Sequence, residues 1–144
     1  MNARAPTEAE ILNPPVPQGW LDPHKLPPDK RSHFIDPASI DWSPSKFPGI
    51  QTKVLFSDPA SGMSTILFKL EPGAVVPLHE HTALEQTWML EGSLVDQEGE
   101  AKAGQFVWRP GGHVHQAYAP NGAILLSIFM KPNLFANGTA FFVK

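Results

Sequence analysis

Proline is the feature that most restricts this chain of 144 residues, which contains 16 prolines, ten of them at or before Pro48. Proline lacks a backbone N–H and therefore interrupts the regular hydrogen bonding of helices and sheets. We expect residues 1–45 to form an extended, proline-rich N-terminal arm. Such an arm can lie across its own domain or a partner subunit. Alternatively, the run from Pro14 to Pro17 could be a polyproline ligand for another protein.

Short segments rich in β-branched and aromatic residues follow the arm from about Ile50 onward. They are separated by turn-forming combinations such as Asp58-Pro59 and Pro120-Asn121-Gly122. This alternation predicts an all-β domain with antiparallel strands, because parallel strands would need crossovers of a dozen or more residues. The expected strands are residues 52–56, 63–70, 85–90, 105–109, 115–119, 123–130 and 140–143.

Composition excludes several classes of function. The formal net charge of −3 offers no attraction to nucleic acid or to an anionic membrane surface. We expect a cytoplasmic protein, since the chain shows no signal-peptide pattern and no apolar run near the ~20 residues of a membrane helix. No cysteine is present, so any metal must be bound through nitrogen and oxygen atoms.

Two histidine pairs lie in the second half of the chain, His79 with His81 and His113 with His115. Residues two apart on a strand point to the same face, so His79 and His81 can direct both imidazoles to one point. Glu85 can return from a short turn to the same side, and His115 opens a later strand. Three nitrogens and one carboxylate oxygen suit one divalent metal ion, with positions left for water, substrate or dioxygen.

The same residues occupy the two sequence motifs of the cupin superfamily, which this chain resembles. The first motif, Gly-x5-His-x-His-x3-Glu-x6-Gly, is present as Gly73, His79, His81, Glu85 and Gly92. The second, Gly-x5-Pro-x-Gly-x2-His-x3-Asn, is present as Gly104, Pro110, Gly112 and His115, with Ala119 in place of the asparagine. The resemblance implies a single cupin domain over residues 1–144, with a double-stranded β-helix, or jelly-roll barrel, over 50–130. It also implies that His79, His81, Glu85 and His115 bind the metal. If the protein is an enzyme, Glu85 is our candidate catalytic residue.

Segments around the motifs, including Trp108 to Gly112 and Phe129 to Phe135, resemble cupins grouped with the ChrR sensor domain and with acetylacetone-cleaving dioxygenases. This resemblance implies a mononuclear iron(II) enzyme that uses dioxygen to cleave a carbon–carbon bond of a β-diketone or similar enolisable carbonyl compound. Zn2+, Ni2+ and Mn2+ are alternative ions. Acetylacetone-cleaving enzymes bind iron through three histidines alone, whereas this chain retains Glu85, as sensor cupins do. A non-catalytic metal or small-molecule sensor and an isomerase or binding cupin therefore stay open as alternatives.

Four further residues are candidates for the substrate pocket: Thr87, Met89, Arg109 and His113. Thr87 and Met89 share the strand parity of Glu85 and can face the cavity, although core packing explains Met89 equally well. Arg109 could hold a carboxylate or carbonyl, and His113 could orient a metal ligand. Cupin barrels expose sheet edges and an apolar outer face that commonly pair with a second subunit, so we expect a homodimer.

Overall fold

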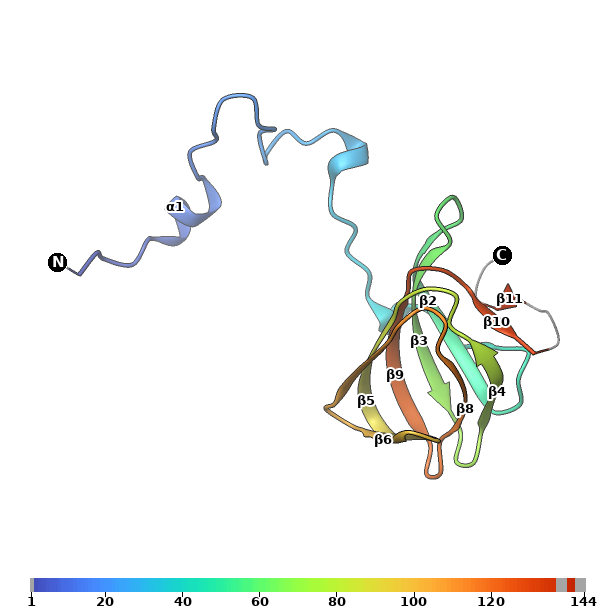
Figure 1. Cartoon of the computed structure of the whole chain (residues 1–144). Coiled ribbons are helices and arrows are strands. Elements are labelled where there is room, and N and C mark those ends of the chain that lie inside the picture. The colour runs from blue at the N-terminus through green and yellow to red at the C-terminus, as the bar shows by residue number, and fades with distance from the viewer. Residues whose placement is uncertain (1, 137–139, 142–144) are drawn as a thin grey trace. The chain divides into compact units, whose positions relative to one another are not determined.

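The computed structural model describes residues 2–136 and 140–141, and the chain divides into two units, Met1–Phe34 and Ile35–Lys144. The first unit contains helix α1 (Glu8–Leu12) and the short 3-10 helix η1 (Pro28–Lys30) (Figure 1). Thr7 caps α1, because its hydroxyl accepts a hydrogen bond from the Glu10 amide while the Glu10 carboxylate accepts one from the Thr7 amide. The other described residues of this unit lie outside helices and strands, as expected for a proline-rich arm.

The second unit begins with the 3-10 helix η2 (Pro37–Ser39) and is otherwise built from strands. Their bounds are β1 (Ser43–Pro44), β2 (Ile50–Asp58), β3 (Met63–Leu70), β4 (Val75–Glu80), β5 (Glu85–Asp96), β6 (Gly99–Lys102), β7 (Phe106–Arg109), β8 (Val114–Tyr118), β9 (Ala123–Phe129), β10 (Asn133–Phe135) and β11 (Ala140–Phe141). The all-β prediction is therefore confirmed. Within the described part of the chain, no helix is long and apolar enough to cross a membrane.

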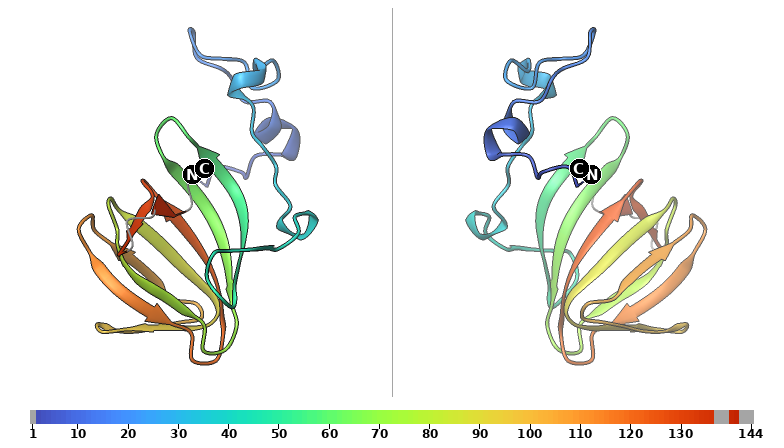
Figure 2. Two further views of the ribbon diagram at one scale, coloured as in Figure 1. Left: turned by 90° about the vertical axis from the view of Figure 1, so that its right-hand side faces the viewer. Right: turned by 90° about the vertical axis from the view of Figure 1, so that its left-hand side faces the viewer.

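Every strand pair is antiparallel, and the neighbours follow the order β1-β2-β3-β9-β5-β8-β4-β10-β11, with β6 and β7 also paired to β5. Strands far apart in the sequence thus lie side by side, as β3 does with β9 and β4 with β8. The strands curl around a common interior, as the jelly-roll prediction requires (Figures 1 and 2). This curl brings the two predicted motif segments onto one wall.

Alternating apolar residues fill the interior of the curled sheet. On β3 and β9 they include Ile66, Phe68, Leu125 and Phe129, each at most 6% exposed. The ring of Phe68 meets that of Phe129 edge-on, with centroids 6.0 Å apart. Burying each such side chain contributes about 1.5–3 kcal/mol to the stability of the fold, and together these side chains make the interior of the sheet apolar.

The predicted strand positions are largely correct, and the omissions have a local cause. Residues 63–70 have the predicted bounds, whereas β1, β4, β6 and β10 were not expected. Strand β4 contains Pro77, which cannot donate to a ladder hydrogen bond and argues against a strand in the sequence. The register shifts between Val76 and His79, and this irregularity accommodates the proline. The end of the strand predicted at 140–143 lies outside the described residues.

Strand β5 changes the face that it presents to the interior part-way along its length. In its first half Glu85, Thr87 and Met89 are buried, at alternate positions. A register shift follows Met89. Beyond it Leu94 is buried and the Asp96 side chain is only 7% exposed, so even-numbered positions now face inward. The one strand therefore supplies two buried carboxylates, Glu85 and Asp96.

Candidate metal centre

Three histidines converge on the inner wall of the sheet. His79 lies on β4, His81 directly follows that strand, and His115 lies on β8, where it is the register partner of His79. Their exposed fractions are 3%, 1% and 3% respectively. One ligand atom from each lies within 4.8 Å of the other two, so the group could hold a metal ion. The structure thus brings together three of the four residues predicted as ligands.

Hydrogen bonds fix which ring nitrogen faces the common point in two of these histidines, His79 and His115. The Nδ1 of His79 donates to the Pro77 carbonyl oxygen at 2.7 Å, and the Nδ1 of His115 donates to Asp96 Oδ2 at 2.7 Å. The Nδ1 of His81 lies 2.9 Å from Glu85 Oε2. A partner at Nδ1 leaves the Nε2 lone pair free, and this is how histidine ligands of metals are usually oriented.

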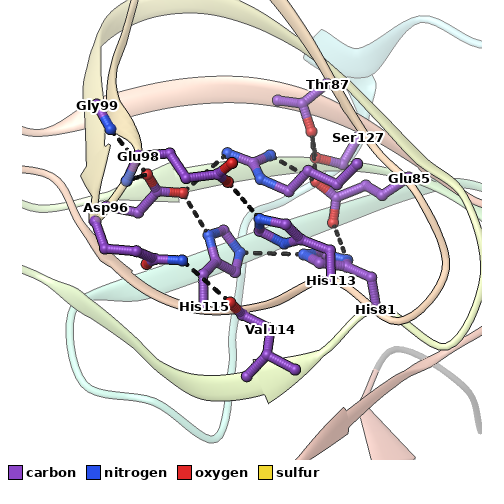
Figure 3. A network of polar contacts seen from close by, with 12 residues as sticks. His81, Glu85, Thr87, Asp96, Glu98, Gly99, His113, Val114, His115 and Ser127 are labelled. Atoms are coloured by element: carbon purple, nitrogen blue, oxygen red, sulfur yellow. Dashed lines mark hydrogen bonds and ion pairs between the residues drawn. The ribbon is translucent and has the colours of Figure 1, made fainter.

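The spacing of the Nε2 atoms suits a shared cation. His81 Nε2 lies 3.1 Å from His115 Nε2 (Figure 3). Two nitrogen ligands at right angles, each about 2.0–2.1 Å from one ion, are about 3 Å apart. A set of imidazole nitrogens suits zinc, copper, iron or nickel and gives no preference for calcium or magnesium. The residues present therefore fit the divalent ion predicted from the sequence, and they do not select one metal.

Burial keeps two of these histidines neutral. It lowers the pKa of His79 to about 4, against the opposing hydrogen bond to the Pro77 carbonyl. Burial likewise lowers the pKa of His115 to about 4, despite the hydrogen bond to Asp96. Both rings are therefore unprotonated at neutral pH and able to donate a lone pair to a metal.

Glu85, the fourth predicted ligand, lies beside the cluster but outside the group of close ligand atoms. Its Oε1 accepts hydrogen bonds from Thr87 Oγ1 at 2.8 Å and from Arg109 Nη1 at 3.3 Å. Burial alone would raise the pKa of Glu85, but the contact with His81 and the charge of Arg109 outweigh it and lower that pKa to about 2. Glu85 is thus a buried, ionised carboxylate, and its role as a direct ligand stays a prediction.

Arg109 links the two carboxylates that hold the histidines. Its side chain is 7% exposed, with Nη1 3.3 Å from Glu85 Oε1 and Nη2 3.7 Å from Asp96 Oδ2. Strand pairing explains the first contact, since Glu85 and Arg109 are register partners on β5 and β7. A buried cation between two buried carboxylates compensates charges that would otherwise be costly to remove from water.

Sequence reasoning missed Asp96. It stands before Gln97-Glu98-Gly99 and reads as the start of a turn, and its Oδ1 does accept from the Glu98 and Gly99 amides at 2.8 and 3.2 Å. Its other oxygen, Oδ2, accepts a hydrogen bond from the Nδ1 of His115 (Figure 3). Burial opposes ionisation of Asp96, but the hydrogen bond from His115 and that from the Glu98 amide outweigh it and keep its pKa below the usual value.

A small cavity of about 50 Å³ lies inside the barrel against this cluster. Its wall is mostly apolar, and its polar lining residues are His79, Glu85, Arg109, His115, Ser127 and Asn133. That volume exceeds the 10–15 Å³ that one water needs, so the cavity has room for at least one water-sized group.

Of the four residues predicted for the substrate pocket, Arg109 lines this cavity. Thr87 is buried behind it, where its hydroxyl is hydrogen-bonded to Glu85 and to Ser127 at 2.8 Å each. Met89 is 0% exposed and belongs to the core cluster. His113 lines a neighbouring pocket and contacts Glu98, with its Nε2 2.5 Å from Glu98 Oε1.

Comparison with protein families identifies residues 30–133 as a match to the ChrR cupin-like domain. The chain belongs to this family. A search of curated proteins finds no match. The family assignment agrees with both motifs and with the placement of the three histidines.

Solved structures share the cupin fold of this ChrR-like domain. A protein of Methylibium petroleiphilum PM1, described as a candidate acetylacetone dioxygenase, has a TM-score of 0.70 at 20% identity, covering 83% of this chain and 92% of that one. An acetylacetone dioxygenase from Acinetobacter johnsonii has a TM-score of 0.65 at 19% identity, covering 86% and 89%. The anti-sigma protein ChrR of Rhodobacter sphaeroides, in complex with SigE, has a TM-score of 0.56 at 22% identity, covering 64% and 49%.

Proposed function

We propose that this ChrR-like cupin is a mononuclear iron(II) dioxygenase of the cytoplasm. Its proposed reaction cleaves a carbon–carbon bond of a β-diketone or a similar enolisable carbonyl compound with dioxygen. The observation that carries the proposal is the convergence of ligand atoms from three buried histidines beside an apolar cavity. The fold similarity to an acetylacetone dioxygenase supports the choice of substrate class.

The residues of this chain have separate tasks in this proposal. His79, His81 and His115 hold the ion, and Asp96 and the Pro77 carbonyl fix two of the rings. A bound divalent ion would supply Lewis acidity that lowers the pKa of an enolisable carbonyl ligand. Arg109 lines the cavity, and its Nε–H, which is buried without a partner, can donate a hydrogen bond to an oxygen of that ligand. The apolar remainder of the wall keeps water away.

Glu85 is the carboxylate that we propose to support the centre, either through His81 or as a direct ligand. Glu85→Gln keeps the shape and removes the charge beside His81. We expect metal affinity to fall by about tenfold or more, as for other groups that orient metal ligands. Metal content and oxygen uptake should be measured on the same preparation. Unchanged metal content together with unchanged turnover would exclude both roles.

The test of the reaction is oxygen consumption by protein loaded with iron(II) under anaerobic conditions. A panel of β-diketones should give oxygen uptake that is stoichiometric with loss of the diketone. His115→Gln should abolish uptake, whereas His33→Gln, a histidine replacement at an exposed position of the first unit, should not change it. Iron-loaded protein that consumes no oxygen across the panel would contradict the proposal and favour the sensor, isomerase or binding alternatives.

We also propose that the protein is a homodimer that pairs through the outer face of β5 and β7. Trp88, Phe106 and Trp108 are 47%, 48% and 61% exposed there. Large exposed aromatic groups of this kind mark interaction surfaces. Sedimentation should show a dimer at micromolar concentration, and Trp108→Glu should shift it toward monomer. A monomeric wild-type protein would refute the assembly.

A further inference from the structure

Asn133 is a buried polar residue of the site that belongs to neither sequence motif. It is the first residue of β10, is 4% exposed and lines the cavity together with His79, Glu85 and His115. The pairing of β10 with β4 sets Phe135 opposite His79 and Leu134 opposite Glu80. Asn133 and Phe135 are buried and Leu134 is exposed, so the two buried side chains share the inner face. The ring of Phe135 lies 4.9 Å from that of His79, which places this face against the histidine cluster.

The side-chain Oδ1 atom of Asn133 is completely buried and has no hydrogen-bond partner among residues 2–136 and 140–141. Buried polar groups are nearly always hydrogen-bonded, because an unpaired group loses its contact with water without replacement. A second atom of the cavity-lining residues, Arg109 Nε, is also buried without a partner. An unpaired amide oxygen and an unpaired N–H beside a metal-binding cluster are expected where a ligand completes the hydrogen bonding.

We propose that Asn133 recognises the oxygen substituents of the ligand and thereby determines the substrate class of this site. This inference rests on the proposed function. An enolised 1,3-dicarbonyl compound carries one carbonyl oxygen, which accepts, and one hydroxyl, which donates. The amide of Asn133 can accept through Oδ1 and donate through Nδ2. It can therefore pair with the enol and also with the enolate, whereas an apolar residue at this position could pair with neither.

The experiment compares two probes on nickel-loaded protein, in which binding is measured without turnover. Acetylacetone carries the two oxygens, and 1-methylimidazole binds a metal through nitrogen with no N–H or oxygen to recognise. Affinities come from calorimetric titration, and metal content is measured before and after each titration. Asn133→Ala leaves room in the cavity, and Asn133→Leu fills it with an apolar side chain. Ser64→Ala is the matched control, since Ser64 Oγ is also buried and unpaired but Ser64 does not line the cavity.

We expect both Asn133 variants to bind acetylacetone about five- to tenfold more weakly than wild type, the usual effect of losing one neutral hydrogen bond. Binding of 1-methylimidazole to Asn133→Ala should stay within about twofold of wild type, and Ser64→Ala should match wild type for both probes. Thermal unfolding of the metal-free variants should show no loss of stability for Asn133→Leu, because that variant removes an unpaired amide oxygen.

Three results would overturn the inference in distinguishable ways. Equal acetylacetone affinity in wild type and both Asn133 variants would refute the role of Asn133 and leave the proposed function intact. Wild-type protein that binds nickel and 1-methylimidazole but not acetylacetone would refute the proposed function, and the inference with it. An equal loss for both probes in Asn133→Ala would show a general structural role instead of oxygen recognition.

Discussion

Replacing Asp96 with asparagine should weaken metal binding by reversing the tautomer of His115. Asp96 Oδ1 accepts from two backbone amides, of Glu98 and Gly99, at 2.8 and 3.2 Å. An asparagine must keep its carbonyl oxygen there, so its NH2 group takes the place of Oδ2, which now accepts from His115 Nδ1 at 2.7 Å. The amide then donates to Nδ1, and the proton of the neutral ring moves to Nε2. A protonated Nε2 cannot bind the ion.

The size of the effect follows from the position of Asp96. Replacing partners that orient a metal-binding histidine typically costs 10- to 100-fold in metal affinity, or about 1.4 to 2.7 kcal/mol. We expect the upper part of this range, because the Asp96 side chain is only 7% exposed and water cannot easily replace it. Two of the three rings keep their present partners, so binding should be weakened and not abolished.

The assay is competition for zinc or cobalt with a chromophoric chelator, on protein stripped of metal at neutral pH. Glu98→Gln is the matched control, since it removes the same charge from a residue that is 64% exposed and contacts His113. Circular dichroism should show that both variants are folded. Asp96→Asn with an affinity within about twofold of wild type, or an equal loss in Glu98→Gln, would refute the tautomer argument.

Three further predictions concern stability. The metal-free protein should lose stability as the pH falls from about 6.5 to 4, because the unfolded histidines take up protons that folded His79 and His115, with pKa values of about 4, do not. Between pH 6.5 and 4 the free energy of unfolding should decrease by about 3 kcal/mol per ring. Urea unfolding at a series of pH values checks this, and a free energy of unfolding that does not change with pH would contradict it. Arg109→Met leaves two buried carboxylates without their cationic partner and should lower the free energy of unfolding by about 3 kcal/mol or more, measured by urea unfolding. A decrease of less than about 1 kcal/mol would show that these ion pairs are not needed for stability. Gly92→Ala places a Cβ 1.9 Å from a backbone oxygen and should lower the free energy of unfolding by more than about 4 kcal/mol. Gly73→Ala should lower it by only about 1–2 kcal/mol, because its Cβ meets nothing within 4 Å. Equal thermal shifts in the two variants would contradict the steric argument.

The histidine cluster could be predicted from the sequence because its geometry depends on short-range rules. His79 and His81 are two residues apart, and this spacing alone sends both side chains to one side of an extended segment. The alternation of apolar residues likewise predicts which face of β3 and β9 is buried. What the spacing could not provide is the pairing of His79 with His115, which depends on β4 lying beside β8. The motif resemblance supplied that information.

Asp96 and Asn133 could not be predicted because their inward orientation depends on long-range features. Counting in twos from Glu85 sends position 96 to the outside, and only the irregularity after Met89 reverses this. Asn133 faces the cavity because a strand of three residues pairs with β4, and such a short strand has no periodic pattern to detect. Arg109 lines the cavity, and its burial between two carboxylates follows from the pairing of β7 with β5, which the sequence does not reveal.

The irregularity in β5 makes this strand unusually sensitive to insertion or deletion during evolution. Loops around the barrel can gain or lose a residue at little energetic cost. A single deletion between Met89 and Leu94 would leave the composition almost unchanged, yet it would rotate Leu94 and Asp96 outward and expose His115 Nδ1. Descendants of this gene that keep the centre should therefore vary freely in loop length while preserving the number of residues from Glu85 to Asp96.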